Sequence, residues 1–209
     1  MAVIKHKDSG EVLLRLDGPS LAGENLSNQR LSGADLSGKD LKNVDFHNAD
    51  LTGADLSGAN LRGANLQGTH LHGAVLHRAN LQAANLTDVM LNGAKLSDAD
   101  FSRATMRYAK LGDCEMTRTD FSGADLSLSD LRGNLTEANL SRTNLSGADL
   151  SGANLTGANL TQANMVDASM AETQMTRVCM DGAIGPHGKR VGGGPRPGPR
   201  RRRWWQFWG

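Results

Sequence analysis

The 209-residue chain is poor in aromatic residues: only eight are Phe, Tyr or Trp, and apolar residues make up 38%. A compact globule of this length usually contains more large apolar groups. The two cysteines argue against a disulfide framework and favour a reducing compartment. No apolar run approaches the roughly 18 residues of a membrane span, and the N-terminal segment lacks the apolar core of a signal peptide. These absences predict a cytoplasmic protein.

Proline is also scarce, with five residues, whereas glycine is abundant, with 25. This composition argues against a disordered or collagen-like chain despite the low complexity. The net charge of +1 conceals an uneven distribution, because residues 21–184 carry a net charge of −6 and residues 185–209 a net charge of +7. An acidic body therefore carries a basic tail, and the two need separate partner arguments.

A large apolar residue stands at every fifth position from Leu21 to Leu131, and the pattern resumes at Leu135 and continues to Met180. These are 33 units in all. In an α-helix five residues advance about 140° net, so successive leucines would scatter around the axis. In a straight strand an odd period sends successive side chains to opposite faces. If the chain instead turns by about 90° once per repeat, four repeats close a square lap of about 20 residues, and every leucine points to the axis.

The other positions of the repeat agree with such a coil. Two residues before each leucine the sequence has a small residue, mostly Ala, which suits a crowded interior corner. The position between them is mainly Asp or Asn and should face outward, and Gly often follows two residues after the leucine, where a tight turn needs its freedom in φ. We expect a buried core ladder with these representative members: Leu51, Leu56, Leu61, Leu66, Phe101 and Phe121.

Tandem A(D/N)LxG units resemble the pentapeptide-repeat family, and the resemblance covers about residues 21–184. It implies an all-β fold, a right-handed quadrilateral β-helix with four repeats per coil and about eight coils. The resemblance is weakly specific for function, since most members are non-enzymatic. Some members that protect or inhibit DNA gyrase match the width and negative charge of duplex DNA and dimerise end to end.

Three domains follow from these patterns. Residues 1–20 should form an N-terminal β-hairpin cap, because two β-prone segments flank the turn signal Asp8-Ser9-Gly10. Residues 21–184 form the β-helix, with a frame slip at 131–135 that predicts a tightened corner. Four consecutive inward methionines, from Met165 to Met180, should pack the last coil. Residues 185–209 are rich in Gly, Pro and Arg and read as a disordered linker that ends in an Arg/Trp-rich motif.

The tail motif is the one candidate docking element in the sequence. Basic residues beside Trp suit an anionic membrane surface. The same residues could instead dock on a protein or fold back over the last coil, and nucleic acid is the less favoured partner. The residues concerned are Arg200, Arg201, Arg202, Arg203, Trp204, Trp205, Phe207 and Trp208.

The sequence offers no catalytic, cofactor-binding or metal-binding constellation. His70, His72 and His77 form the only histidine cluster, but no acidic or Cys ligand falls at a matching offset, so we interpret them as surface residues. Cys114 occupies an inward position and should be an inert core thiol, whereas Cys179 stands at an outward position about three coils away.

These features predict a non-catalytic scaffold for protein–protein interaction, with no cofactor, whose tail docks on a membrane surface or a partner. A location at the inner membrane face and a homodimer through the C-terminal end of the solenoid both stay open. The alternative is a DNA-mimicking protein that binds DNA gyrase or topoisomerase. Basic residues interrupt any acidic stripe and weigh against it, namely Arg62, Arg78, Arg103, Arg107, Lys110, Arg118 and Arg132. A third reading is a delivered effector or a membrane-surface adaptor directed by the tail, although no export signal is readable.

Overall fold

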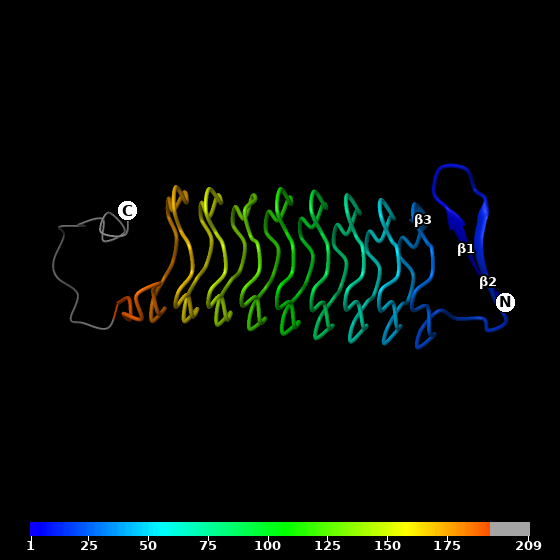
Figure 1. The fold of residues 1–209 in the computed structure, drawn as a ribbon, viewed down its shortest axis with the longest axis horizontal. Helices are drawn as coiled ribbons and strands as arrows, with labels where there is room; N and C mark the ends of the chain where they lie inside the picture. Colours follow the sequence, from blue (N-terminus) through cyan, green and yellow to red (C-terminus); the bar gives the residue numbers. More distant parts are fainter. Residues whose placement is uncertain (193–209) are drawn as a thin grey trace.

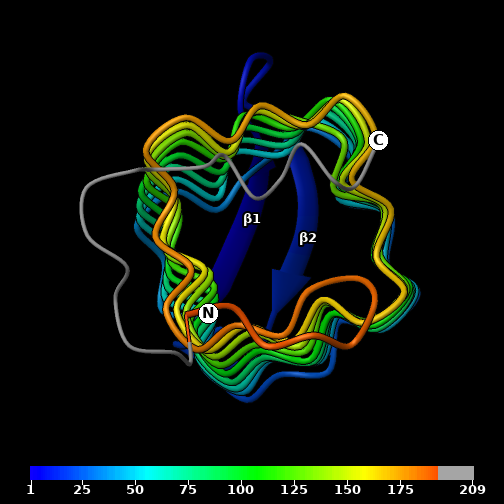
Figure 2. The same ribbon diagram turned by 90° about the vertical axis from the view of Figure 1, so that its left-hand side faces the viewer.

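The computed structural model describes residues 1–192, which form a straight rod of stacked coils (Figure 1). Seen along the rod axis, successive coils superimpose on a rounded square (Figure 2). The five-residue period therefore does make a four-sided coil, as the sequence predicts. This architecture is a quadrilateral β-helix without any α-helix in the described residues.

Each repeat bends the chain through one tight turn. In the unit of Leu51, the N–H of Ala54 donates to the carbonyl oxygen of Leu51 at 3.0 Å, and Gly53 between them has a φ of +65°. A turn that needs a positive φ at its third residue favours Gly there, because Gly lacks a Cβ. Four such turns complete a lap.

Between the turns, neighbouring coils pair as parallel strands. Residues 20 apart form bridges, such as Asp50 with His70. The N–H of Leu51 donates to the carbonyl oxygen of His70 at 2.8 Å. Each side of the square is too short for more than one bridge, so the coils contain a single named strand, β3 (Ala34–Asp35).

The interior is filled by the central residues and the small residues two positions before them. The six representative ladder residues are all buried, with no exposed side-chain area: Leu51, Leu56, Leu61, Leu66, Phe101 and Phe121. The rings of Phe101 and Phe121 stack one coil apart, with their centroids 5.3 Å from each other. Because burying one Leu contributes roughly 1.5–3 kcal/mol, and each coil contacts only its neighbours, stability should accumulate coil by coil.

The frame slip shortens one lap by one residue. Bridges run 20 residues apart up to Lys110 with Asp130, then 19 apart from Glu115 with Asn134, and 20 apart again from Asn134 with Asn154. The coils before and after the slip keep their four faces aligned, because only one corner is shortened by the missing residue.

A hairpin covers the N-terminal end of the rod. It consists of β1 (Ala2–His6) and β2 (Val12–Leu16), which pair antiparallel, and β1 also pairs antiparallel with β3 of the first coils. The order β2-β1-β3 places the hairpin across the open end, where Figure 2 shows it behind the coils. The cap protects the edge that would otherwise be free to pair with another chain.

The C-terminal end differs from the linker expected from Gly185 onward. Residues 185–192 turn back on the last coil: the N–H of Val191 donates to the carbonyl oxygen of Ala183 at 2.7 Å, and the N–H of Gly182 donates to that of Val191 at 2.9 Å. A positive φ of +72° at Gly188 allows this turn. The expected boundary at 184/185 is thus wrong for residues 185–192, and the remainder of the predicted tail, 193–209, lies outside the described residues.

Candidate interaction surfaces

Outward Asp and Asn residues form columns that are part of the fold. Their side-chain oxygens accept the backbone N–H two residues later, as Asp55 does from Ser57 at 2.9 Å. Asn amides also donate to the preceding coil: Asn60 Nδ2 donates to Asp40 Oδ1 at 2.9 Å. An Asn stacked on an Asp therefore replaces charge repulsion with a hydrogen bond. These hydrogen bonds give the recurring Asp and Asn residues a structural role.

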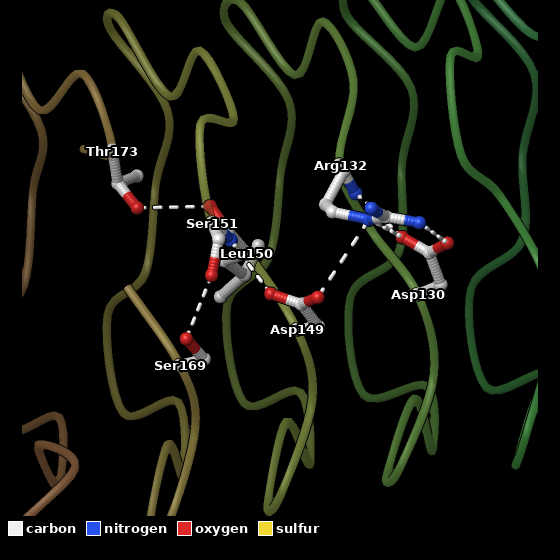
Figure 3. Close-up of polar contacts among 7 residues, drawn as sticks. All are labelled: Asp130, Arg132, Asp149, Leu150, Ser151, Ser169 and Thr173. Carbon is white, nitrogen blue, oxygen red and sulfur yellow. Dashed lines mark hydrogen bonds and ion pairs between the residues drawn. The ribbon is translucent and has the colours of Figure 1, made fainter. Parts of the chain in front are cut away.

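Arg132 binds two stacked carboxylates beside the frame slip (Figure 3). Its Nε and Nη2 donate to Asp130 at 2.9 and 2.7 Å, and its Nε lies 3.6 Å from Asp149 Oδ2. The hydrogen bond from Arg132 holds the pKa of Asp130 below its usual range, and the same bond raises the pKa of the guanidinium. Two aspartates one coil apart would repel each other, so Arg132 makes their stacking tolerable.

The polar contacts continue toward the C-terminus. Asp149 accepts the backbone N–H of Ser151 at 2.9 Å, and the hydroxyls of Ser151 and Ser169 lie 2.7 Å apart. Thr173 Oγ1 donates to the carbonyl oxygen of Leu150 at 2.8 Å (Figure 3). Nucleophilic catalysis by Ser needs an adjacent base, and neither serine hydroxyl contacts a histidine within residues 1–192. The cluster is best described as a structural network at the surface.

The histidine cluster stays on the surface. The rings of His70 and His72 meet edge to face at 6.4 Å between centroids. Within residues 1–192, no group of three His, Cys, Asp or Glu side chains is arranged to hold a metal ion. In the same part of the chain, no helix has the length and apolar character needed to cross a membrane.

The two cysteines have opposite surroundings. Cys114 is only 2% exposed, and its Sγ donates to the carbonyl oxygen of Leu91 at 3.0 Å. Burial raises the pKa of the Cys114 thiol to about 12, which keeps it protonated. Cys179 is exposed on the last coil.

An Arg–Asp pair ties two coils together at one corner of the rod. Arg118 donates to Asp98 through Nε at 2.7 Å and through Nη2 at 2.9 Å. The bidentate hydrogen bond from Arg118 lowers the pKa of Asp98, with a smaller contribution from the charge of Arg78 in the same corner column. The outer surface therefore carries positive and negative charges side by side.

Two exposed apolar side chains escaped the sequence analysis. Tyr108 is 46% exposed and Leu128 is 49% exposed. Both stand two residues after a central residue, where the repeat usually has Gly, and both have a φ of +60°. A large apolar residue at the Gly position was the signal that could have found them.

Among the shallow depressions on the described surface, two lie along the coils. One, of about 460 Å³, is polar and includes Arg103, Ser122 and Arg142 among its lining residues. The other, of about 400 Å³, lies at the C-terminal end and includes Met175, Val178 and Val191. The predicted docking residues of the tail, from Arg200 to Trp208, lie outside the described part of the chain, so the structure does not place them.

Comparison with known proteins identifies the repeat. The family model described as pentapeptide repeats matches eight copies over residues 20–58, 54–93, 94–133, 134–170 and 148–184. No curated protein matches the chain. Among solved structures, the chain is 32% identical to HetL, a pentapeptide repeat protein involved in heterocyst differentiation regulation from the cyanobacterium Nostoc sp. strain PCC 7120, over 80% of this chain and 83% of that one, with a TM-score of 0.40.

Two further structures show lower identity. QnrB1, a plasmid-mediated fluoroquinolone resistance protein, is 22% identical over 78% of this chain and 89% of its own, with a TM-score of 0.39. A pentapeptide repeat protein from the Arabidopsis thaliana thylakoid lumen is 27% identical over 57% of this chain and 66% of its own, with a TM-score of 0.26. The family model covers most of the chain, and the fold is the one the repeats require. The protein therefore belongs to the pentapeptide repeat family and is a right-handed quadrilateral β-helix.

Proposed function

We propose that this repeat scaffold is non-catalytic and acts by binding other proteins on its outer faces. The observation that carries the proposal is the division of side chains between the two sides of the coil wall. Inward side chains fill the core, so the interior of the described rod has no cavity for a substrate. Outward side chains instead present a regular, rigid surface over about eight coils. A preformed surface of this kind binds a partner without the free-energy cost of ordering loops or side chains.

Photo-crosslinking tests this function. A benzoylphenylalanine would be introduced at one outward position per side of a single lap: Arg62, Gln67, His72 and His77. In the native host, a protein-binding scaffold should give discrete adducts that depend on the side carrying the probe. Adducts of equal yield on all four sides, or none on any side, would contradict the proposal.

The C-terminal tail is proposed as the second docking element, from Arg200–Arg203 and the aromatic residues after them. Arginines would pair with anionic headgroups and Trp side chains would sit at the interface, which would hold the protein at the inner membrane face. Truncation should follow Gly192 rather than Ile184, because residues 185–192 are bonded to the last coil. The truncated chain should no longer float with vesicles containing 30% phosphatidylserine. Unchanged flotation would assign the tail to a protein partner instead.

The surface gives less support to a DNA-mimicking gyrase binder. Each of the four sides carries exposed basic side chains, for example Arg62, Arg107, Lys110 and Arg118. Mimicry of duplex DNA requires a continuous negative face. A DNA gyrase supercoiling assay should accordingly show no inhibition at micromolar protein, whereas inhibition would favour the alternative.

A further inference from the structure

Tyr108 and Leu128 form an exposed apolar pair on one corner of the rod, which we call the Tyr108 corner. They occupy equivalent turn positions one coil apart. Apart from Met1, they are the large hydrophobic residues exposed within residues 1–192. The next residue in this column is Gly147, and a Cβ placed on it would lie 2.7 Å from Leu128 Cδ2. The Leu128 side chain therefore lies against the neighbouring coil and extends the apolar surface along the corner.

Fold stability does not explain these two residues. Both adopt a φ of +60°, a conformation that is unfavourable for residues with a Cβ and free of strain for Gly. About half of the surface of each residue is in water, so little burial offsets this cost. Other non-Gly residues share this positive φ, but Tyr108 and Leu128 are the large apolar ones among them, which makes the exposed pair a candidate for a functional role.

The lap of Tyr108 carries three cations without an ion pair, Arg103, Arg107 and Lys110. The guanidinium of Arg107 lies 5.6 Å from the centre of the Tyr108 ring. Lys110 and Arg103 are exposed on the same lap. Among residues 1–192, the arginine and lysine side chains in ion pairs are those of Arg118 and Arg132 alone. The positive charge of this lap is therefore available to an external anion.

Carboxylates limit this basic zone to one coil. Asp88 precedes Tyr108 in the same corner column, and Asp125 lies on the following coil. Asp125 already accepts Ser127 N–H at 3.1 Å and Asn144 Nδ2 at 2.9 Å. Since coils are about 4.8 Å apart, the zone is a narrow band that crosses the rod rather than a stripe along its axis.

We infer that the Tyr108 corner docks an acidic peptide segment of a partner protein that carries one large apolar side chain. The apolar side chain would cover Tyr108 and Leu128, and its flanking carboxylates would pair with Arg107 and Lys110. This inference rests on the proposed scaffold function and names the surface and partner chemistry. Tyr and Arg are enriched among residues that dominate binding energy, which supports this placement.

The narrow band favours a peptide over nucleic acid. A polyphosphate that followed the rod would meet Asp88 and Asp125 on the adjacent coils. An aliphatic side chain such as Leu128 also offers a base no aromatic face to stack on. A short segment crossing the rod avoids both problems, because its charges can be confined to the basic lap.

The test is an array of 12-residue peptides that vary a central Leu, Phe, Trp or Ser and the number of flanking Glu, Gln or Lys residues. The probe is the labelled full-length chain with Arg200–Arg203 replaced by Gln, so that the tail does not bind the acidic peptides. Variants in this background are Tyr108→Gly, Leu128→Gly and Lys110→Glu. Matched controls are Ala83→Gly, another exposed residue at a positive φ, and Arg62→Glu, an exposed cation elsewhere.

Binding should require both flanking Glu and a central apolar residue. Fluorescence anisotropy with the strongest peptide should show at least tenfold weaker binding for each of the three variants and no change for the two controls. The Gly variants should have urea midpoints no lower than the parent chain, which excludes unfolding as the cause.

Three results would overturn the inference: no peptide whose binding depends on Tyr108, equal binding of Ser-centred peptides, or stronger Tyr108-dependent binding of a 20-base-pair DNA duplex. If crosslinked adducts still form on another side of the rod, only this inference fails. If no adducts form either, the scaffold function fails with it.

Discussion

Gly133 lies so close to Cys114 that a Cβ on Gly133 would stand 2.8 Å from the carbonyl oxygen of Cys114. The same Cβ would approach Met116 Cε to 2.9 Å. Most other laps have Ala at this inward position, and the preceding lap has Cys114, but the lap with the missing residue draws the backbone inward and leaves no room for a methyl group. Gly133 is thus the residue that makes the frame slip possible.

Gly133→Ala should lower the free energy of unfolding by about 1–3 kcal/mol, because overpacking must displace backbone atoms. Urea denaturation followed by circular dichroism measures this. Gly112→Ala is the control, since its Cβ would meet only the ends of the Asn92 and Asp130 side chains, each at 3.1 Å. Equal midpoints for the two variants would show that the slip corner is not tight.

The Arg118–Asp98 pair predicts a measurable pKa difference. Asp98 accepts a bidentate hydrogen bond from Arg118, which lowers its pKa. A depressed folded-state pKa contributes stability that is present above the unfolded-state pKa and lost as the pH falls through the folded-state pKa. In Arg118→Gln the pKa of Asp98 should rise toward its ordinary value, as measured by carboxyl NMR titration. Arg78→Gln, which removes only a distant charge, should raise the pKa less. The reverse order would refute the assignment of the main cause to Arg118.

The regular part of the fold follows from the five-residue period because geometry leaves one solution that buries every Leu. The inward polar residues also fit the positions that the period assigns to the core. Thr69, Thr119 and Thr143 replace Ala at the small inward position, and each hydroxyl donates to a central-residue carbonyl of the preceding coil at 2.8–3.0 Å. No described side-chain nitrogen or oxygen that is buried lacks a partner.

What the period could not predict lies where the repeat is broken. The turn at residues 185–192 depends on Gly188 and on the contact of Val191 with the last coil, which are single events without a repeating pattern. The Tyr108 corner was missed because the turn position tolerates many residues, so a large apolar side chain at that position was not read as a sign of exposure. The five-residue period predicts whether a side chain points into the core or outward, but not what an outward side chain contacts.

The cysteines predict a simple labelling pattern. Because the Cys114 thiol is buried and its pKa is raised to about 12, it should not react with iodoacetamide at pH 8 in the native state. Cys179 is exposed and should react. Mass spectrometry should therefore find one adduct per native chain and two after denaturation in urea. A native Cys179→Ser variant that still becomes labelled would show that Cys114 is accessible.

The turn position itself predicts opposite effects for two substitutions in open surroundings. Ala83 has a φ of +56°, so Ala83→Gly removes backbone strain. Gly also adds entropy to the unfolded chain, which offsets part of this gain. The net effect should be a free energy of unfolding that is higher by about 0.5–1 kcal/mol. Gly58 has a φ of +64°, and a Cβ on it would meet nothing within 4 Å. Gly58→Ala should therefore cost about 1 kcal/mol or more through conformation alone. Urea midpoints at constant slope measure both. If both variants shift the midpoint in the same direction, backbone strain does not set the preference for Gly at this turn position. Tyr108 and Leu128 would then not be retained against a conformational cost.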